Sequence, residues 1–133
     1  MSRATWLRLL RFSFVGAIGI GVQLSALAAF SVMRINYLLA TALAVECAVV
    51  HNFLWHRRLT WADRVRSGWG DFLQSLLRFH LSNGLISLAG NLLVVRTLSG
   101  RFRLPLLPAN MMAIVLCFVA NFLASDHWVF RFR

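Results

Sequence analysis

The sequence predicts an all-α membrane protein with four transmembrane helices. They are arranged as two parallel two-helix repeats, with a short interfacial amphipathic helix before the third. Three observations carry this prediction: the composition, an internal duplication and four long apolar stretches. Of the 133 residues, 59% are hydrophobic and only four are acidic. Such a chain has too few charged residues to cover the surface of a small soluble domain.

Two short motifs recur along the chain with nearly the same spacing. Leu9-Leu10-Arg11-Phe12 is repeated in the second half as Leu76-Leu77-Arg78-Phe79. Asn52-Phe53-Leu54 is repeated in the same order as Asn121-Phe122-Leu123. A duplication of this kind indicates that one structural unit is used twice. We expect a single domain over residues 1–133. Its first repeat covers about residues 9–61 and its second about residues 76–130.

Four stretches are long and apolar enough to cross a bilayer, which takes about 20 residues in a helix. Backbone that faces lipid has to satisfy its own hydrogen bonds, so we expect each stretch to be helical. The first is too long for a signal peptide, and it is duplicated later in the chain. The predicted spans are roughly residues 12–33, 35–55, 79–98 and 104–124.

The arginines predict the orientation of these spans. All 14 basic residues are arginine; ten precede the first span, lie between the second and third, or end the chain, and four lie on the other side. Cytoplasmic segments carry the excess of arginine, so both termini and the middle loop are expected in the cytoplasm. The first and third spans then cross in the same direction, which makes the repeats parallel. We read the net charge of +10 as membrane-edge charge and expect no nucleic-acid partner.

The middle loop has the pattern of an amphipathic helix that lies in the membrane interface and leads into the third span. Its apolar residues recur at helical spacing, with charged and polar residues between them. The apolar residues are Trp69, Phe72, Leu73, Leu76 and Leu77.

Small residues mark a face on each of the first two spans. Such faces let helices approach closely in a membrane. Glu46 lies about 160° around the second helix from Ala44, so it points away if the alanine face packs on the first helix. The small residues are Ala40, Ala44 and Ala48 on the second span, and Ala17, Gly21, Ser25 and Ala29 on the first.

Three polar residues lie well inside the predicted spans: Glu46, Gln23 and Asn91. Ionisable groups are rare inside membranes and mark functional sites there. Glu46 is the only acid at this depth. The residue that corresponds to it in the second repeat is Val115. Two interpretations are open: Glu46 couples a proton or gates a substrate, or it is a hydrogen-bonded residue that joins helices.

A second group of candidates lies near the cytoplasmic ends of the spans. Arginine pairs well with phosphate through its fork of donors, so this layer could hold the phosphate of a lipid. The alternatives are membrane anchoring for the arginines and helix–helix hydrogen bonding for the asparagines. The candidates are Arg11, Arg57, Arg58, Arg78, His80, Asn52 and Asn121. No catalytic constellation, metal-ligand spacing or cofactor motif accompanies them.

The order of several motifs along nearly the whole chain resembles the GtrA-like family of four-helix membrane proteins. At Gln23, where many members carry Asp, this chain departs from the family pattern. The motifs are Arg11-Phe12-Ser13-Phe14-Val15-Gly16, Leu39-Ala40, Asn52-Phe53-Leu54, Arg57-Arg58-Leu59-Thr60-Trp61, Arg78-Phe79, Pro108-Ala109-Asn110, Asn121-Phe122-Leu123 and Trp128-Val129-Phe130.

The resemblance implies a role in cell-surface polysaccharide synthesis at the bacterial cytoplasmic membrane. It implies a translocase, or a translocase subunit, for a polyprenyl-phosphate-linked sugar rather than an enzyme. The alternative is a membrane anchor that recruits a glycosyltransferase, since related domains are fused to dolichol-phosphate-mannose-synthase-like enzymes. A small multidrug exporter is disfavoured because the arginine bias predicts a single orientation. Four short helices leave little room for a sealed path, so we also expect a homo-oligomer or a partner glycosyltransferase.

Overall fold

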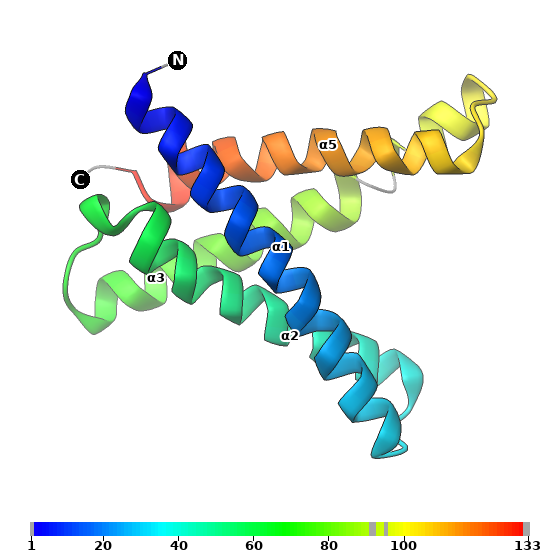
Figure 1. Ribbon diagram of the computed structural model, residues 1–133, viewed down its shortest axis with the longest axis horizontal. Helices are drawn as coiled ribbons and strands as arrows, with labels where there is room; N and C mark the ends of the chain where they lie inside the picture. The colour runs from blue at the N-terminus through cyan, green and yellow to red at the C-terminus, as the bar shows by residue number, and fades with distance from the viewer. Residues whose placement is uncertain (1, 91–92, 95, 132–133) are drawn as a thin grey trace. The chain divides into compact units, whose positions relative to one another are not determined.

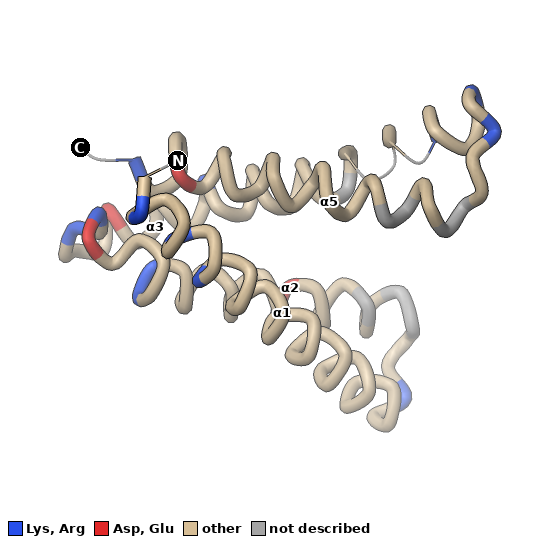
Figure 2. The backbone as a smooth tube through the Cα atoms, turned by 45° about the horizontal axis from the view of Figure 1, so that its top comes forward, with Lys and Arg blue, Asp and Glu red and all other residues tan. Residues whose placement is uncertain are grey.

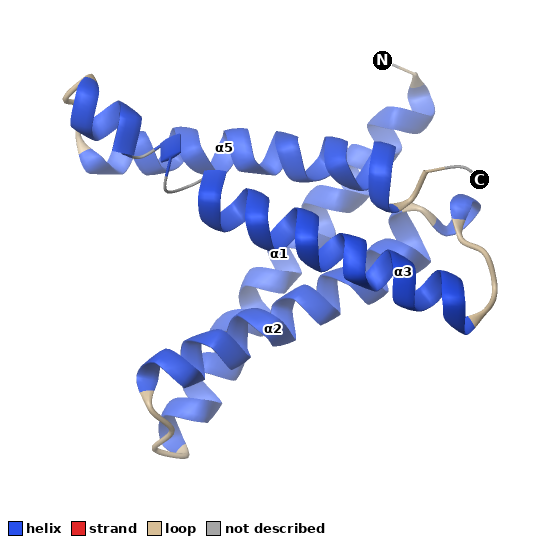
Figure 3. Cartoon of the chain, turned by 180° about the vertical axis from the view of Figure 1, so that it is seen from behind, coloured by secondary structure: helices blue, strands red, loops and turns tan. Residues whose placement is uncertain are grey.

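The computed structural model describes residues 2–90, 93–94 and 96–131. Every element within these ranges is helical, which confirms the all-α prediction (Figure 3). Two helices in the described part of the chain are long and apolar enough to cross a membrane: Arg3–Val32 and Met112–Val129. The bilayer crossings expected at 35–55 and 79–98 stay predictions. The chain divides into two compact units, 1–65 and 66–133, and one repeat lies in each.

In the first unit, α1 (Arg3–Val32) packs side by side with α2 (Tyr37–Trp55) (Figure 1). α1 begins at Arg3 rather than at residue 12, so the N-terminal segment with Trp6 is continuous with the first span. Ser2 starts the helix because its Oγ accepts a hydrogen bond of 3.2 Å from the Thr5 N–H. α2 is followed by a π-helical turn, η1 (His56–Thr60), and a short 3₁₀ turn, η2 (Ala62–Arg64).

The turn between α1 and α2 ends α1 in a Schellman motif. The Ile35 N–H donates to the Phe30 carbonyl at 3.3 Å, and the Arg34 N–H donates to the Ser31 carbonyl at 3.0 Å. Arg34 has a φ of 57°, a left-handed conformation that glycine usually supplies and that costs another residue about 1–2 kcal/mol. Arg103, in the corresponding turn of the second unit, has a φ of 53°. The turn between the two helical runs of each unit therefore has an arginine with a left-handed φ at the corresponding position.

The α1–α2 interface uses the alanine face predicted for α2. Ala40, Ala44 and Ala48 are all buried. The small face predicted for α1 is wrong: Ala17, Gly21, Ser25 and Ala29 are not buried, and the buried residues of α1 are Phe12, Val15 and Gly19. The reason is angular, because Ala17 and Gly21 lie about 200° around the helix from Val15 and Gly19.

In the second unit, the predicted interfacial helix and the start of the predicted third span form one helical run. The run starts as an amphipathic α-helix, α3, whose exposed side carries Trp69, Leu73 and Leu77. It then continues in π-helical turns and packs along the last helix. The elements are α3 (Trp69–Phe79), η3 (His80–Gly84), η4 (Ile86–Gly90), η5 (Arg96–Arg101), α5 (Leu106–Ala124) and η6 (Ser125–Val129).

The buried positions of α5 and η6 repeat those of α2 and η1 when the two Asn-Phe-Leu motifs are aligned. Five pairs of buried apolar residues match in this way: Ala40 and Ala109, Ala44 and Ala113, Ala48 and Cys117, Phe53 and Phe122, and Trp61 and Phe130. Each unit is thus built on the same small-residue face followed by the same aromatic positions.

Candidate functional site

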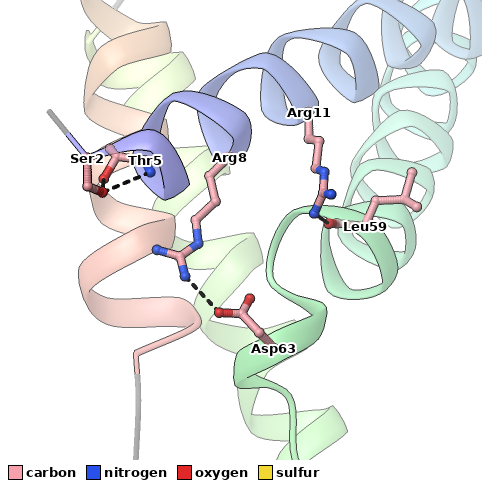
Figure 4. A network of polar contacts seen from close by, with 6 residues as sticks. All are labelled: Ser2, Thr5, Arg8, Arg11, Leu59 and Asp63. Carbon is pink, nitrogen blue, oxygen red and sulfur yellow. Dashed lines mark hydrogen bonds and ion pairs between the residues drawn. The ribbon is translucent and has the colours of Figure 1, made fainter.

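The basic residues gather at the ends of the helices rather than along them (Figure 2). In the first unit, one end holds Arg11 of α1 and Arg57 and Arg58 of η1. Arg11 Nη1 donates a hydrogen bond of 2.9 Å to the Leu59 carbonyl (Figure 4). A guanidinium is favoured at this place because the carbonyls at a helix C-terminus carry negative partial charge. The bond joins the start of α1 to the turn after α2.

The second unit repeats this contact at the corresponding residues. Arg78 Nη1 lies 3.5 Å from the carbonyl of Trp128, the residue that corresponds to Leu59. The Arg78 guanidinium carbon also lies 5.8 Å from the centre of the Trp128 ring, within the range of a cation–π contact. The longer distance makes the second hydrogen bond the weaker of the two. Two of the four arginines predicted to bind phosphate, Arg11 and Arg78, therefore each hold a turn of their own unit.

Three rings pack together in the first unit, and one of them belongs to Phe12, the residue next to Arg11. Phe12 stacks on His56 with 4.6 Å between ring centroids, and Trp61 meets their edges at 5.9 Å and 5.4 Å. His56 Nδ1 lies 3.1 Å from Thr60 Oγ1. Burial, and secondarily the charge of His51, lower the pKa of His56 to about 3. His56 is therefore neutral near pH 7 and serves packing rather than anion binding.

An ion pair outside the predicted site joins the first and last elements of the first unit. Arg8 Nη2 lies 2.7 Å from Asp63 Oδ2, which links α1 to η2 (Figure 4). The Asp63 side chain is 52% exposed. Exposed pairs contribute only about 0–1 kcal/mol. The pair nonetheless places one carboxylate beside the arginines of this end.

The remaining basic candidates differ in their freedom to meet a ligand. Arg58 is exposed and Arg57 is half-buried, and both lie on η1. His80, on η3, is half-buried and its Nδ1 lies 3.0 Å from the Leu76 carbonyl one turn before. His80 thus uses one ring nitrogen on its own helix, whereas Arg58 presents its guanidinium outward.

Both candidate asparagines lie between helices. Asn52 sits against Gly19 of α1, where an added Cβ would lie 2.7 Å from Asn52 Nδ2. Its Oδ1 lies 3.2 Å from His51 Nδ1. Asn121 is buried, and its Nδ2 donates to Ser87 Oγ at 3.0 Å. These positions fit helix–helix packing, one of the two interpretations of the asparagines that the sequence left open.

The predicted intramembrane polar residues are not brought together by these contacts. Glu46 is exposed on α2, on the side away from the buried alanines, and Gln23 is half-buried on α1. Asn91 lies outside the described residues. Within the described ranges, no three His, Cys, Asp or Glu side chains are grouped so that they could hold a metal ion.

The sequence analysis missed the Arg8–Asp63 pair, the burial of His56 and the carbonyl contacts of Arg11 and Arg78. Only the arginine contacts had a signal in the sequence, since Arg11 and Arg78 recur in the duplication. The family model described as "GtrA/DPMS, transmembrane domain" matches residues 11–130, nearly the whole chain and both repeats. A sequence search of curated proteins gives no match.

Proposed function

The chain belongs to the GtrA/DPMS transmembrane domain family, and from this premise we propose that it moves a polyprenyl-phosphate-linked sugar across the cytoplasmic membrane, alone or as a subunit. Membership makes it an integral membrane protein linked to cell-surface polysaccharide synthesis. The single observation that carries the proposal is the basic end of the first unit, where Arg57 and Arg58 lie on a turn already fixed by Arg11.

This end suits a lipid phosphate for two physical reasons. Arginine offers planar, paired donors that match phosphate oxygens. The turn that carries Arg57 and Arg58 is held on one side by the Arg11 bond and on the other by buried His56 and Thr60. A preformed turn loses less conformational entropy when a ligand binds, so more of the contact energy appears as affinity.

We propose that the tail of the lipid lies along the first unit. Large apolar side chains stay exposed along α1, among them Phe14, Ile20 and Leu24. In a membrane they face acyl chains, and a polyprenyl tail would meet the same surface. Glu46 and Gln23, at intermediate depth, are the polar groups proposed to meet the moving headgroup.

The proposal includes an orientation and partners. We place both termini and the 56–78 segment in the cytoplasm, following the ten-to-four arginine bias. A membrane glycosyltransferase that makes the lipid-linked sugar, and a second copy of the chain, are the proposed partners. Reporter fusions after Leu98 and after Arg133 should label opposite sides of the membrane; labelling of the same side contradicts the orientation.

The binding site is tested by Arg57→Ala combined with Arg58→Ala. Loss of even one charge-assisted hydrogen bond, worth about 1.5–3 kcal/mol, should weaken polyprenyl-phosphate binding by at least about 10-fold. Arg34→Ala, at the other end of the same unit, is the matched control and should bind normally. Arg58→Lys should also bind poorly, because an ammonium cannot make the paired contact. Unchanged affinity in the double variant at normal folding overturns the phosphate site.

A further inference from the structure

The two helical runs of the second unit are held in a fixed antiparallel register. A Cβ placed on Gly90 would lie 3.0 Å from Cys117 Sγ, and Asn121 Nδ2 donates to Ser87 Oγ at 3.0 Å. A step of one helical turn toward the C-terminus of α5 therefore corresponds to a step of about one turn toward the N-terminus of the facing run.

The next turn of this register brings Asn83 of η3 to the level of Ser125 of η6. Beyond it, the Phe79 and Phe130 rings close the end of the unit with centroids 6.3 Å apart. We call Asn83, Asn121 and Ser125 the polar level of the second unit.

Three side-chain atoms of the polar level are buried and have no hydrogen-bond partner within the described residues: Asn83 Nδ2, Asn121 Oδ1 and Ser125 Oγ. Asn121 is 9% exposed and Ser125 is fully buried. Buried polar groups in folded proteins are nearly always paired with protein, water or ligand. This level of the second helical pair therefore has unused donors and acceptors.

The first unit closes the same level with different chemistry. The residues corresponding to Asn83 and Ser125 are Gly16 and His56. There the imidazole fills the interface, stacked on Phe12 and bonded to Thr60. At this level the first repeat is thus filled by the His56 ring, whereas the second carries two small polar side chains at the equivalent places.

We propose that the polar level of the second unit binds a hydroxyl-bearing, uncharged group, the sugar of the lipid substrate, and this rests on the proposed function. Asn83 offers a donor, Asn121 an acceptor and Ser125 either, which complements a hydroxyl that both donates and accepts. None of the three side chains is charged, so the level suits a sugar and not its phosphate. The repeats have diverged, with the anchored basic turn in the first and the sugar contact in the second.

The first test asks whether the polar level meets water. In a chain with Cys47→Ala and Cys117→Ala, single Ser125→Cys and Asn83→Cys variants are treated with a charged, membrane-impermeant methanethiosulfonate. Val15→Cys, buried at the same level of the first unit, is the matched control. The proposal predicts at least tenfold faster reaction at 125 and 83 than at 15. Equal, slow reaction at all three positions overturns it.

The second test asks whether the polar level recognises sugar. Binding of polyprenyl-phosphate glucose and polyprenyl-phosphate mannose is compared with binding of polyprenyl phosphate. The chain should prefer at least one sugar-bearing lipid, and Ser125→Ala should reduce that preference by about tenfold, the value of one hydrogen bond. Binding of the sugar-free lipid should not change.

The outcomes separate this inference from the proposed function. The sugar contact is overturned if the chain prefers neither sugar-bearing lipid, or if Ser125→Ala leaves the preference intact. If the cysteines at 83 and 125 react quickly in that case, the polar level binds water only. The proposed function fails on a different result, namely polyprenyl-phosphate binding that is indifferent to Arg57 and Arg58.

Discussion

Gly19 allows the close fit of α1 against Asn52 of α2, and Gly19→Ala tests that packing directly. A Cβ at this position would lie 2.7 Å from Asn52 Nδ2 and 2.8 Å from Asn52 Cγ, closer than real Cβ contacts come. The amide would have to rotate away and give up its contact with His51. Gly21→Ala is the matched control, since a Cβ there has nothing within 4 Å.

The expected magnitude follows from two opposing terms. Both substitutions gain helix propensity, up to about 1 kcal/mol, and this term cancels when the two variants are compared. Overpacking in a tight interface costs about 1–3 kcal/mol and applies to Gly19→Ala alone. Gly19→Ala should therefore be about 1–3 kcal/mol less stable than Gly21→Ala.

The assay is the free energy of unfolding in bicelles for wild type and both variants, with Asn52→Ala and the Gly19→Ala/Asn52→Ala pair completing a double-mutant cycle. Removing the Asn52 amide should restore most of the loss, so the coupling energy should be about as large as the overpacking penalty. Gly19→Ala within about 0.5 kcal/mol of Gly21→Ala would refute the packing of Asn52 on Gly19.

The site carries three further predictions. Arg11→Met should destabilise the protein by about 0.5–1.5 kcal/mol, since the bond is exposed to solvent, and Arg78→Met by less, because its bond is 3.5 Å; equal losses in chemical unfolding would contradict the two carbonyl contacts. His56 has a folded pKa of about 3, below the usual 6.5, so its stability contribution is complete above pH 6.5 and declines as pH falls. The free energy of unfolding at pH 5 should therefore be about 2 kcal/mol lower than at pH 8. A His56→Gln variant with the same pH dependence would mean that another group causes it. Glu46→Gln should abolish translocation if Glu46 titrates, whereas Glu46→Leu should be the harmful change if it only bonds helices; full activity of the Gln variant at matched expression excludes proton coupling.

Much of the helical framework was predictable because it depends on local pattern. The alanine face of α2 has the regular spacing of a buried stripe, and Ala40, Ala44 and Ala48 are buried as expected. Its counterpart on α5, with Ala109 and Cys117, could have been found by carrying the alignment of the two Asn-Phe-Leu motifs through the whole second half. The α1 face was misplaced because small residues on a lipid-exposed side look the same in sequence as those at an interface.

The contacts of the candidate site were harder to predict for a physical reason. Arg11 and Arg78 bind backbone carbonyls, which every residue carries, so no side-chain motif marks the acceptor. His56 is buried by Phe12, which is distant in the chain, and its neutral state depends on that tertiary contact. The span at 79–98 was drawn from the length of its apolar stretch, which does not reveal the π-helical turns that the second unit has there.

The central claim, translocation of a lipid-linked sugar, is tested most directly in liposomes that contain only this purified chain. Fluorescent polyprenyl-phosphate glucose and polyprenyl-phosphate mannose are placed in both leaflets, and the fraction accessible to an external quencher is followed with time. The account predicts that accessibility rises past the outer-leaflet half with the wild-type chain and much more slowly with the Arg57→Ala/Arg58→Ala variant. Accessibility that stays at half in both, while the wild type still binds the lipid, contradicts translocation by this chain alone and leaves the roles of translocase subunit and glycosyltransferase recruiter.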